Sequence, residues 1–287
     1  MTEPGKHSPS TKDTKIHARD GHPLAATVWR PPVARRVAII NSATGVPRGF
    51  YRHFGMALAE AGYMAIAYDY RGTGDSAPKH LKGCNARMRD WALLDMTGVI
   101  DWVRTHLEPE KLFLVGHSIG GQAAGLIDNA DAIDGMITMS AQSGYWRLQG
   151  GEQKYLTGLH VHVTLPLLSR LFGYMPWSRL NGGLDLPKGV ALEFARWCRD
   201  PDYLLGDRSL PLHRYRQFTA PVLAYSFGDD KWGTRESVDA MMKAYPNVER
   251  RHVEPAEAGL DRIGHVGFFR PASKNLWAEA IDWLAGN

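Results

Sequence analysis

Cysteine is scarce in this chain, which has only two among its 287 residues, Cys84 and Cys198. Two cysteines are too few for the disulfide framework of a small secreted protein, although they could still pair. Their scarcity fits a reducing compartment. Long apolar runs are missing as well, since no stretch approaches the roughly 20 apolar residues of a membrane-spanning helix. The net charge of +4 comes from scattered Lys and Arg residues without a basic block. We therefore expect neither a membrane span nor a nucleic-acid partner.

The first thirteen residues, "MTEPGKHSPSTKD", lack the apolar core of a secretory signal. We expect residues 1–13 to be a flexible N-terminal tail, folding to begin near Thr14, and the protein to be cytoplasmic. A hydrophobic content of 44% and a charged content of 22% fit a globular protein. The length predicts one sizeable core in place of two separate domains.

Short apolar runs alternate with longer helical patterns along most of the chain. Asp20-Gly21 first predicts a hairpin, because Asp-Gly favours the tight turn between two antiparallel strands. Residues 91–107 then repeat apolar positions with a helical period, as do residues 276–284. Runs that are apolar on both faces are typical of strands buried in a parallel sheet, and the alternation predicts a doubly wound α/β fold with helices on both faces. The predicted buried strands are residues 37–40, 64–68, 112–115, 136–139 and 222–227.

One long segment breaks this alternation. Residues 143–215 contain no clean strand and accumulate aromatic side chains among Pro, Gly and Arg. Because so long a connection between two core strands is rarely a bare loop, we expect a helical cap there, inserted into a core of residues 14–142 and 216–287. Its aromatic residues fit an apolar acyl pocket and a small core of the cap equally well.

Ser118 lies in the pentapeptide Gly116-His117-Ser118-Ile119-Gly120, a G-x-S-x-G pattern between a predicted strand and a predicted helix. Small neighbours are needed where a serine stands on a sharp strand-to-helix turn, since larger side chains would collide with the strand and helix beside it. The hydroxyl is then exposed above the carboxyl edge of the sheet, where open α/β sheets bind ligands. The pattern predicts that Ser118 is a nucleophile.

A serine nucleophile needs a base and an acid, which follow it along the chain in the order acid then base on such a fold. Asp229 and Asp230 follow the predicted strand 222–227, and we favour Asp230 because it lies one step further into the loop. His265 lies between glycines in the loop after the next strand-like segment and is the predicted base. The segment after residues 136–139 offers no rival carboxylate.

Acyl transfer also needs two N–H donors aimed at the developing oxyanion. One is expected from Ile119, which follows the nucleophile, and the other from Ala43 or Thr44 in the small, glycine-bearing loop after residues 37–40.

These segments together resemble the α/β-hydrolase superfamily. "DYRGTGDSAP" at 69–78 is similar to a turn that follows the fourth strand in many of its esterases, lipases and peptidases. Three further segments resemble a little-characterised bacterial branch: "ATGVPRGFY", "ARWCRDPDYL" and "RIGHVGFFRP". The resemblance implies the α/β-hydrolase fold, Ser118, Asp230 and His265 as a triad, and no particular substrate. The chain departs from most relatives in carrying Asn41-Ser42 where they have His-Gly. Its acid loop also differs from the usual pattern, so Asp229 remains an alternative to Asp230 as the acid.

The resulting hypothesis is a serine hydrolase that needs no cofactor and cleaves an ester, thioester or amide of a small acyl substrate. Two alternatives stay open: acyl transfer by the same triad, and a non-catalytic member of the fold that binds a ligand or partner. A nucleotide site at Gly72–Gly74 lacks its third glycine. A metal site at His160 and His162 lacks a completing Cys or carboxylate.

Overall fold

The computed structural model describes residues 8–181 and 183–287 and contains one eight-stranded sheet with the order β1-β2-β4-β3-β5-β6-β9-β10. Strands β4, β3, β5, β6, β9 and β10 are parallel, and β2 joins β4 antiparallel. This arrangement confirms the predicted α/β fold and each of its five buried strands. The strands are β1 (Ser10–His17), β2 (Pro23–Arg30), β3 (Arg36–Asn41), β4 (Tyr63–Tyr68), β5 (Lys111–His117), β6 (Gly135–Met139), β9 (Val222–Phe227) and β10 (Val248–Val253).

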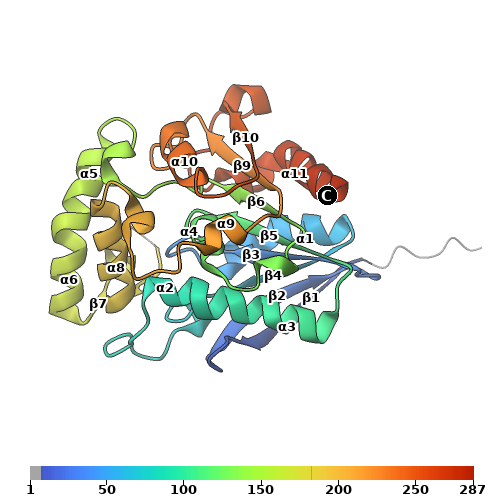
Figure 1. The fold of residues 1–287 in the computed structure, drawn as a ribbon, viewed down its shortest axis with the longest axis horizontal. Coiled ribbons are helices and arrows are strands. Elements are labelled where there is room, and N and C mark those ends of the chain that lie inside the picture. Colours follow the sequence, from blue (N-terminus) through green and yellow to red (C-terminus); the bar gives the residue numbers. More distant parts are fainter. Residues whose placement is uncertain (1–7, 182) are drawn as a thin grey trace, which may run out of the picture.

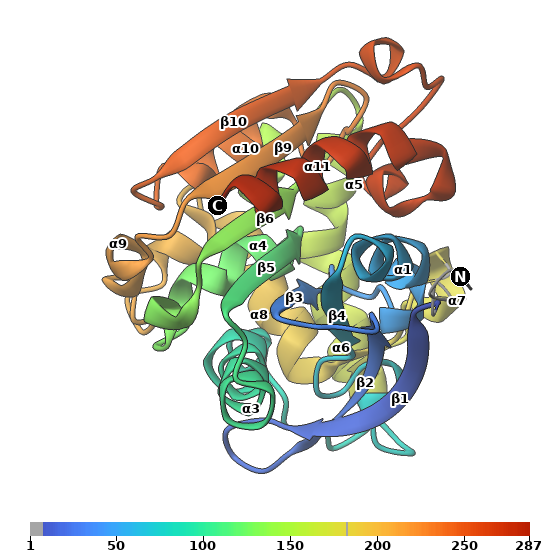
Figure 2. The same ribbon diagram turned by 90° about the vertical axis from the view of Figure 1, so that its right-hand side faces the viewer.

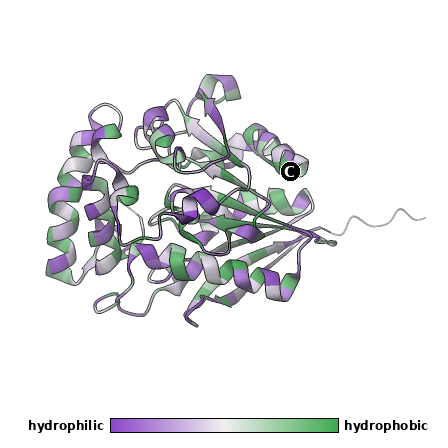
Figure 3. Cartoon of the chain, viewed as in Figure 1, coloured by the Kyte–Doolittle hydropathy of each residue, from purple (hydrophilic) through white to green (hydrophobic). Residues whose placement is uncertain are grey.

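Helices cover both faces of the sheet (Figures 1 and 2). One face packs against α1 (Arg52–Glu60) and α11 (Lys274–Gly286), which contribute Phe54 and Trp277 to an aromatic cluster. The other face packs against α3 (Thr97–Leu107), α4 (Ile119–Gln122), α9 (Arg214–Gln217) and α10 (Arg235–Met242). The hydrophobic colouring of Figure 3 runs through the central strands, as expected for a sheet buried on both sides.

Both helical predictions are confirmed with one addition. The helix predicted at 91–107 begins with α2 (Met88–Asp90) and a π-helical segment, η3 (Trp91–Met96), before it continues as α3. Short 3₁₀ turns connect other elements: η1 (Arg48–Tyr51), η2 (Gly74–Ser76), η4 (Ala123–Leu126), η5 (Ala130–Ala132), η6 (Trp146–Leu148), η8 (Tyr203–Gly206), η9 (Pro255–Ala258), η10 (Gly267–Phe269) and η11 (Pro271–Ser273).

The N-terminal hairpin differs from its prediction in two details. Strand β1 begins at Ser10, four residues before the expected start at Thr14, because an edge strand needs no apolar pattern when its side chains face solvent. The predicted tail, residues 1–13, otherwise lies largely outside the described residues. The Asp20-Gly21 turn does connect β1 to β2, with Gly21 at φ +83°, but the connection has five residues in place of two.

The segment between β6 and β9 folds mainly into helices that stand at one end of the sheet (Figure 1). A salt-bridge network fastens this segment to the sheet side of the molecule, because Arg89 of α2 contacts both Glu193 of α8 and Asp207 at 2.6 and 2.9 Å. The boundaries of a separate cap at 143 and 215 stay a prediction. Its elements are α5 (Gln153–Leu159), the π-helical η7 (His160–Thr164), α6 (Leu165–Phe172), β7 (Tyr174–Met175), α7 (Ser178–Asn181), β8 (Leu186–Pro187) and α8 (Lys188–Arg199).

Candidate active site

Ser118 occupies a strained turn between β5 and α4. Its backbone has φ 52° and ψ −117°, a positive-φ conformation that is unfavourable for a residue with a side chain. The turn is fixed from both sides, because the Ser118 N–H donates to the Met139 carbonyl at 2.9 Å and the Ser118 carbonyl accepts the N–H groups of Gly121 and Gln122. The strain is therefore held by the strand beside it and by the first turn of α4.

The glycines around Ser118 are required by close packing. A Cβ on Gly120 would overlap the carbonyl oxygen of Asn41 at the end of β3, and a Cβ on Gly116 would overlap the backbone of Gly121. The strand and helix thus approach each other closely enough to lift Ser118 into a cavity, where its side chain makes no hydrogen bond with any residue that the structure describes.

His265 and Asp230 form a hydrogen-bonded pair beside Ser118. The Nδ1 atom of His265 lies 2.8 Å from Oδ2 of Asp230. The same oxygen accepts the Ser140 hydroxyl at 2.7 Å, and the other accepts the N–H groups of Trp232 and Gly233 at 2.9 Å. Burial alone would raise the pKa of Asp230, but His265 and these donors outweigh it and hold the pKa below its ordinary value. The carboxylate is consequently ionised and oriented.

Asp229, the alternative acid, makes different contacts. Its two oxygens accept the N–H groups of Ile263 and Gly264 at 3.0 and 2.8 Å. Gly264 has φ +58°, so the loop turns sharply just before His265. Asp229 thus holds the loop that carries the histidine, whereas Asp230 contacts the histidine ring.

A second histidine, His117, lies beneath the site in a role that the sequence analysis missed. Its Nε2 lies 2.8 Å from the His265 carbonyl oxygen, which only accepts, so Nε2 carries the proton. Its Nδ1 then accepts the Tyr51 hydroxyl at 2.9 Å, and that hydroxyl in turn accepts the Ala43 N–H. Burial lowers the pKa of His117 to about 3, so the ring is neutral. This relay connects the loop after β3 to the loop of His265.

The relay bears on the two oxyanion-donor candidates after β3. The Ala43 N–H points to the Tyr51 hydroxyl at 2.9 Å and is already used. Among the described residues, the Thr44 N–H has no hydrogen-bond partner, and Thr44 lines the cavity with Ser118. Ile119 is the first residue of α4, where a helix leaves its N–H groups unpaired.

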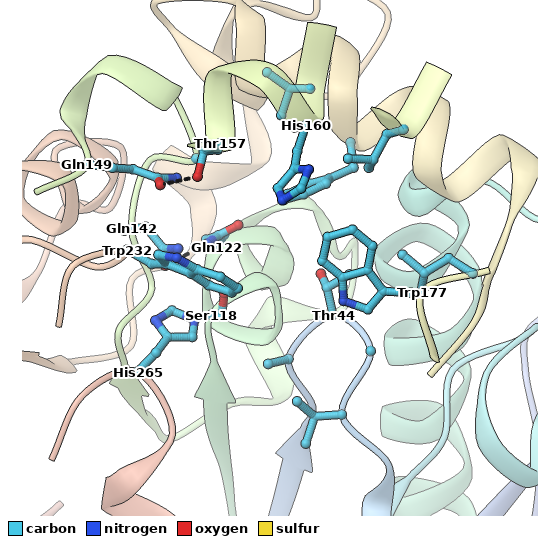
Figure 4. A pocket seen from close by; sticks show the side chains of 18 of the residues that line it. Thr44, Ser118, Gln122, Gln142, Gln149, Thr157, His160, Trp177, Trp232 and His265 are labelled. Carbon is cyan, nitrogen blue, oxygen red and sulfur yellow. Dashed lines mark hydrogen bonds between the residues drawn. The ribbon is translucent and has the colours of Figure 1, made fainter. Parts of the chain in front are cut away.

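Ser118 and His265 line one cavity of about 150 Å³ (Figure 4). Trp232 packs on His265 with ring centroids 5.4 Å apart, and Trp177 and Thr44 line the opposite side. Of the aromatic residues in the inserted segment, Trp177, Phe194 and Tyr203 line the cavity, while Trp197 is buried in the core and Tyr155 is exposed. Some of these aromatic residues therefore line the cavity and others pack in the interior, and the acyl pocket stays a prediction.

Polar side chains from several elements reach the same cavity. Tyr203 donates to Gln122, which donates to Gln142 at 3.1 Å. Thr157 and His160 enter from the helical segment above (Figure 4). The sequence analysis did not single out these glutamines or Trp232, because nothing local distinguishes them from other polar or aromatic residues.

No metal cluster and no membrane-spanning helix is found within residues 8–181 and 183–287. His160 contacts Trp177 with ring centroids 5.6 Å apart, and His162 bonds the Gly158 carbonyl at 2.9 Å. The two histidines point to different partners.

The sheet order, the strained serine turn and the histidine–aspartate pair define an α/β hydrolase. The family model described as serine aminopeptidase, S33, matches residues 34–204, and the chain belongs to this family. No curated protein matches the chain in sequence.

Solved structures share the fold at low sequence identity. An esterase of Pyrococcus furiosus, PF2001, has a TM-score of 0.64 at 17% identity, with 96% of this chain and 91% of that chain covered. Est1E of Butyrivibrio proteoclasticus, solved with ferulic acid bound, has a TM-score of 0.63 at 16% identity, covering 95% and 98%. The hypothetical protein PA2218 of Pseudomonas aeruginosa has a TM-score of 0.66 at 14% identity, covering 99% and 95%.

Proposed function

We propose that this protein is a serine hydrolase that cleaves carboxylic esters of small acyl groups through an acyl-enzyme. The observation that carries the proposal is the ionised, fully hydrogen-bonded Asp230 against His265, whose ring lines the same cavity as the strained Ser118. A histidine with a purely structural role needs neither a buried carboxylate bonded to its Nδ1 nor a serine on a strained strand-to-helix turn in the same cavity.

The proposed reaction has two halves. His265 accepts the Ser118 proton through Nε2 as the hydroxyl attacks the ester carbonyl, and Asp230 holds the tautomer and stabilises the imidazolium. His265 then gives the proton to the leaving alkoxide, and the acyl group remains on Ser118. In the second half His265 activates water, which releases the acid. The N–H groups of Ile119 and Thr44 stabilise the oxyanion. Thr44 is favoured over Ala43 because the Ala43 N–H already donates to the Tyr51 hydroxyl.

The cavity favours a compact acyl or aryl group. A volume of about 150 Å³ matches an apolar cavity that holds a benzene-sized molecule. Its walls combine Leu165, Trp177 and Phe194 with the amides of Gln122 and Gln142. We propose that the segment 143–215 acts as a cap, since it supplies half of the residues that line the cavity.

An ester is favoured over a peptide with a free amino terminus. None of the described residues that line the cavity is Asp or Glu, and an aminopeptidase needs a carboxylate or a similar acceptor for the α-ammonium group. Asp230 lies nearby, but its oxygens are already occupied by four donors.

The test combines a covalent probe with a substrate panel. Purified protein is treated with a fluorophosphonate and weighed by intact mass spectrometry, with Ser118→Ala as the nucleophile variant and Ser10→Ala, on exposed β1, as the matched control. We expect one adduct on the wild type and on Ser10→Ala, and none on Ser118→Ala. Acetyl, butyryl and benzoyl p-nitrophenyl esters should be cleaved faster than the decanoyl ester. A folded wild type that is neither labelled nor active would refute the proposal.

A further inference from the structure

The helical segment that walls the cavity has a second, outward face that is apolar. Residues 153–172 form one long helix from α5, η7 and α6, which runs along the outer edge of the molecule in Figure 1. The inner face carries Val161 and Leu165, which are buried and line the cavity. The outer stripe, as we define it, is 48–70% exposed and consists of Tyr155, Leu156, Leu159, Val163, Leu167 and Leu171.

The π-helical segment keeps this stripe on one face. Side chains spaced by four residues drift by ~40° per step around an ideal helix of 3.6 residues per turn, or ~160° from Tyr155 to Leu171. The wider turn of η7, His160–Thr164, adds about one residue and turns the later positions back by ~100°. The net drift of roughly 60° leaves a continuous ridge ~24 Å long.

We infer that the outer stripe is the contact between two copies of this chain, paired antiparallel about a twofold axis. Nearly aligned helices pack when the ridges of one fit into the grooves of the other, and a twofold contact uses the same patch on both subunits. Val163 lies eight residues from Tyr155 and eight from Leu171, so it faces its own counterpart across the axis.

The exposed apolar area of the outer stripe comes close to what such a contact needs. The six side chains expose on the order of 600 Å², and with the backbone and polar neighbours that they flank the patch approaches the ~800 Å² per partner of a stable complex. A single exposed patch of this size is at the upper limit for a monomer.

The charge pattern favours a second copy over a lipid surface. Lys154 and Arg170 are the only Lys, Arg, Asp or Glu residues in 153–172, and both stand near the ends of the helix. Helices that lie on membranes carry a strongly basic polar face, whereas the core of a protein interface is depleted of charge.

The contact would also brace the active site. Thr157, His160, Val161 and Leu165 line the cavity from the inner face of the same helix. A partner packed on the outer face therefore holds this wall in place from behind. The inference itself rests on the outer face alone and stands or falls independently of the hydrolase proposal.

The first experiment measures the molar mass of the full chain by light scattering and sedimentation velocity at micromolar concentrations. We expect the wild type at twice 31.9 kDa, and the double variant Val163→Glu, Leu167→Glu at half that mass with an unchanged circular dichroism spectrum. Val33→Glu is the control, because Val33 is 71% exposed but lies outside the helix. A monomeric wild type, or a Val33→Glu variant that dissociates equally, overturns the inference.

The second experiment tests the axis and does not depend on a charge-bearing variant. Val163→Cys is made in a Cys84→Ser background, since the other cysteine, Cys198, is buried. A short bis-maleimide should link Val163→Cys into a covalent dimer and leave Val33→Cys monomeric. Equal linking of both, or of neither, overturns the pairing. Flotation with phosphatidylglycerol vesicles tests a lipid surface as the alternative partner. If the wild type is monomeric and floats with the vesicles, and the double variant does not float, the stripe binds a membrane and the inference is wrong.

Discussion

Replacing Asp230 with Asn should disable the site while preserving its shape. All the groups that contact the carboxylate are donors: the hydroxyl of Ser140, the backbone N–H groups of Trp232 and Gly233, and Nδ1–H of His265. The amide oxygen of Asn satisfies the two backbone groups, so its NH₂ faces His265. That NH₂ can only donate, which forces Nδ1 of the imidazole to accept and moves the ring proton to Nε2. The nitrogen that must take the Ser118 proton is then already protonated.

The expected loss is large because the base is in the wrong tautomer. The corresponding change in a serine protease triad lowers kcat by ~10⁴, which is about 5.5 kcal/mol of barrier. We expect a similar loss here for Asp230→Asn, measured as steady-state hydrolysis of a p-nitrophenyl ester. KM should change little, since no contact with substrate is removed, and the midpoint of thermal unfolding should fall by only a few degrees.

Asp229→Asn is the matched control. Its neighbours are the N–H groups of Ile263 and Gly264, and Asn keeps one acceptor for them. One hydrogen bond to a charged group is lost, which costs about 1.5–3 kcal/mol of stability, and kcat should fall by less than ~10² because the histidine ring keeps its acid. If Asp229→Asn lost as much kcat as Asp230→Asn, or if Asp230→Asn kept more than a tenth of the activity, the assignment of the acid would be wrong.

Three further predictions concern groups around the site. Arg89→Met should lower the free energy of unfolding by about 2 kcal/mol in urea titrations, since it removes one of the two arginines that contact Glu193 and Asp207, both nearly buried, and leaves these carboxylates to Arg196; a change below 1 kcal/mol would contradict this. His117 has a pKa of about 3 in the folded protein, below its ordinary value near 6.5, so the unfolded chain binds the extra proton between these values. Acidification below pH 6.5 should therefore destabilise the wild type relative to His117→Gln by up to about 1.4 kcal/mol per pH unit. The measurement is the free energy of unfolding of both proteins in urea, and an equal change between pH 7 and pH 5 in the two would refute this. Gly120→Ala has no room for its Cβ at the end of β3, so the turn that carries Ser118 should shift and fluorophosphonate labelling should fall at least tenfold. Labelling at the wild-type rate would contradict this.

The parts of the fold that the sequence predicts are those with a local signal. The five buried strands are apolar on both faces, which leaves few other interpretations. The start of β1 at Ser10 was missed because its exposed side chains show no such pattern. The outer stripe was missed for a related reason. Its side chains, four residues apart, share one face only because of the π-helical segment, and no residue type indicates such a segment in the sequence.

The site shows the same division. The candidate serine, its glycines and the order of the candidate acid and base follow from short motifs. The choice between the two aspartates and between the two oxyanion donors depends on long-range contacts. The hydroxyl of Tyr51 in η1, for example, accepts the Ala43 N–H. Ser140, at the end of β6, adds a hydroxyl donor to those that bind Asp230.

The neutral state of His117 has a consequence for the proposed mechanism. The rings of His117 and His265 are 5.4 Å apart, and His265 becomes an imidazolium when it takes the Ser118 proton. A positive charge on His117 would oppose that step by roughly 3 kcal/mol at an effective dielectric constant of 20, or about a hundredfold in rate. Burial prevents this, because it holds the pKa of His117 at about 3 while the ring still donates to the His265 carbonyl. A neutral donor at this position thus anchors the loop of the base without competing with the charge that catalysis requires there.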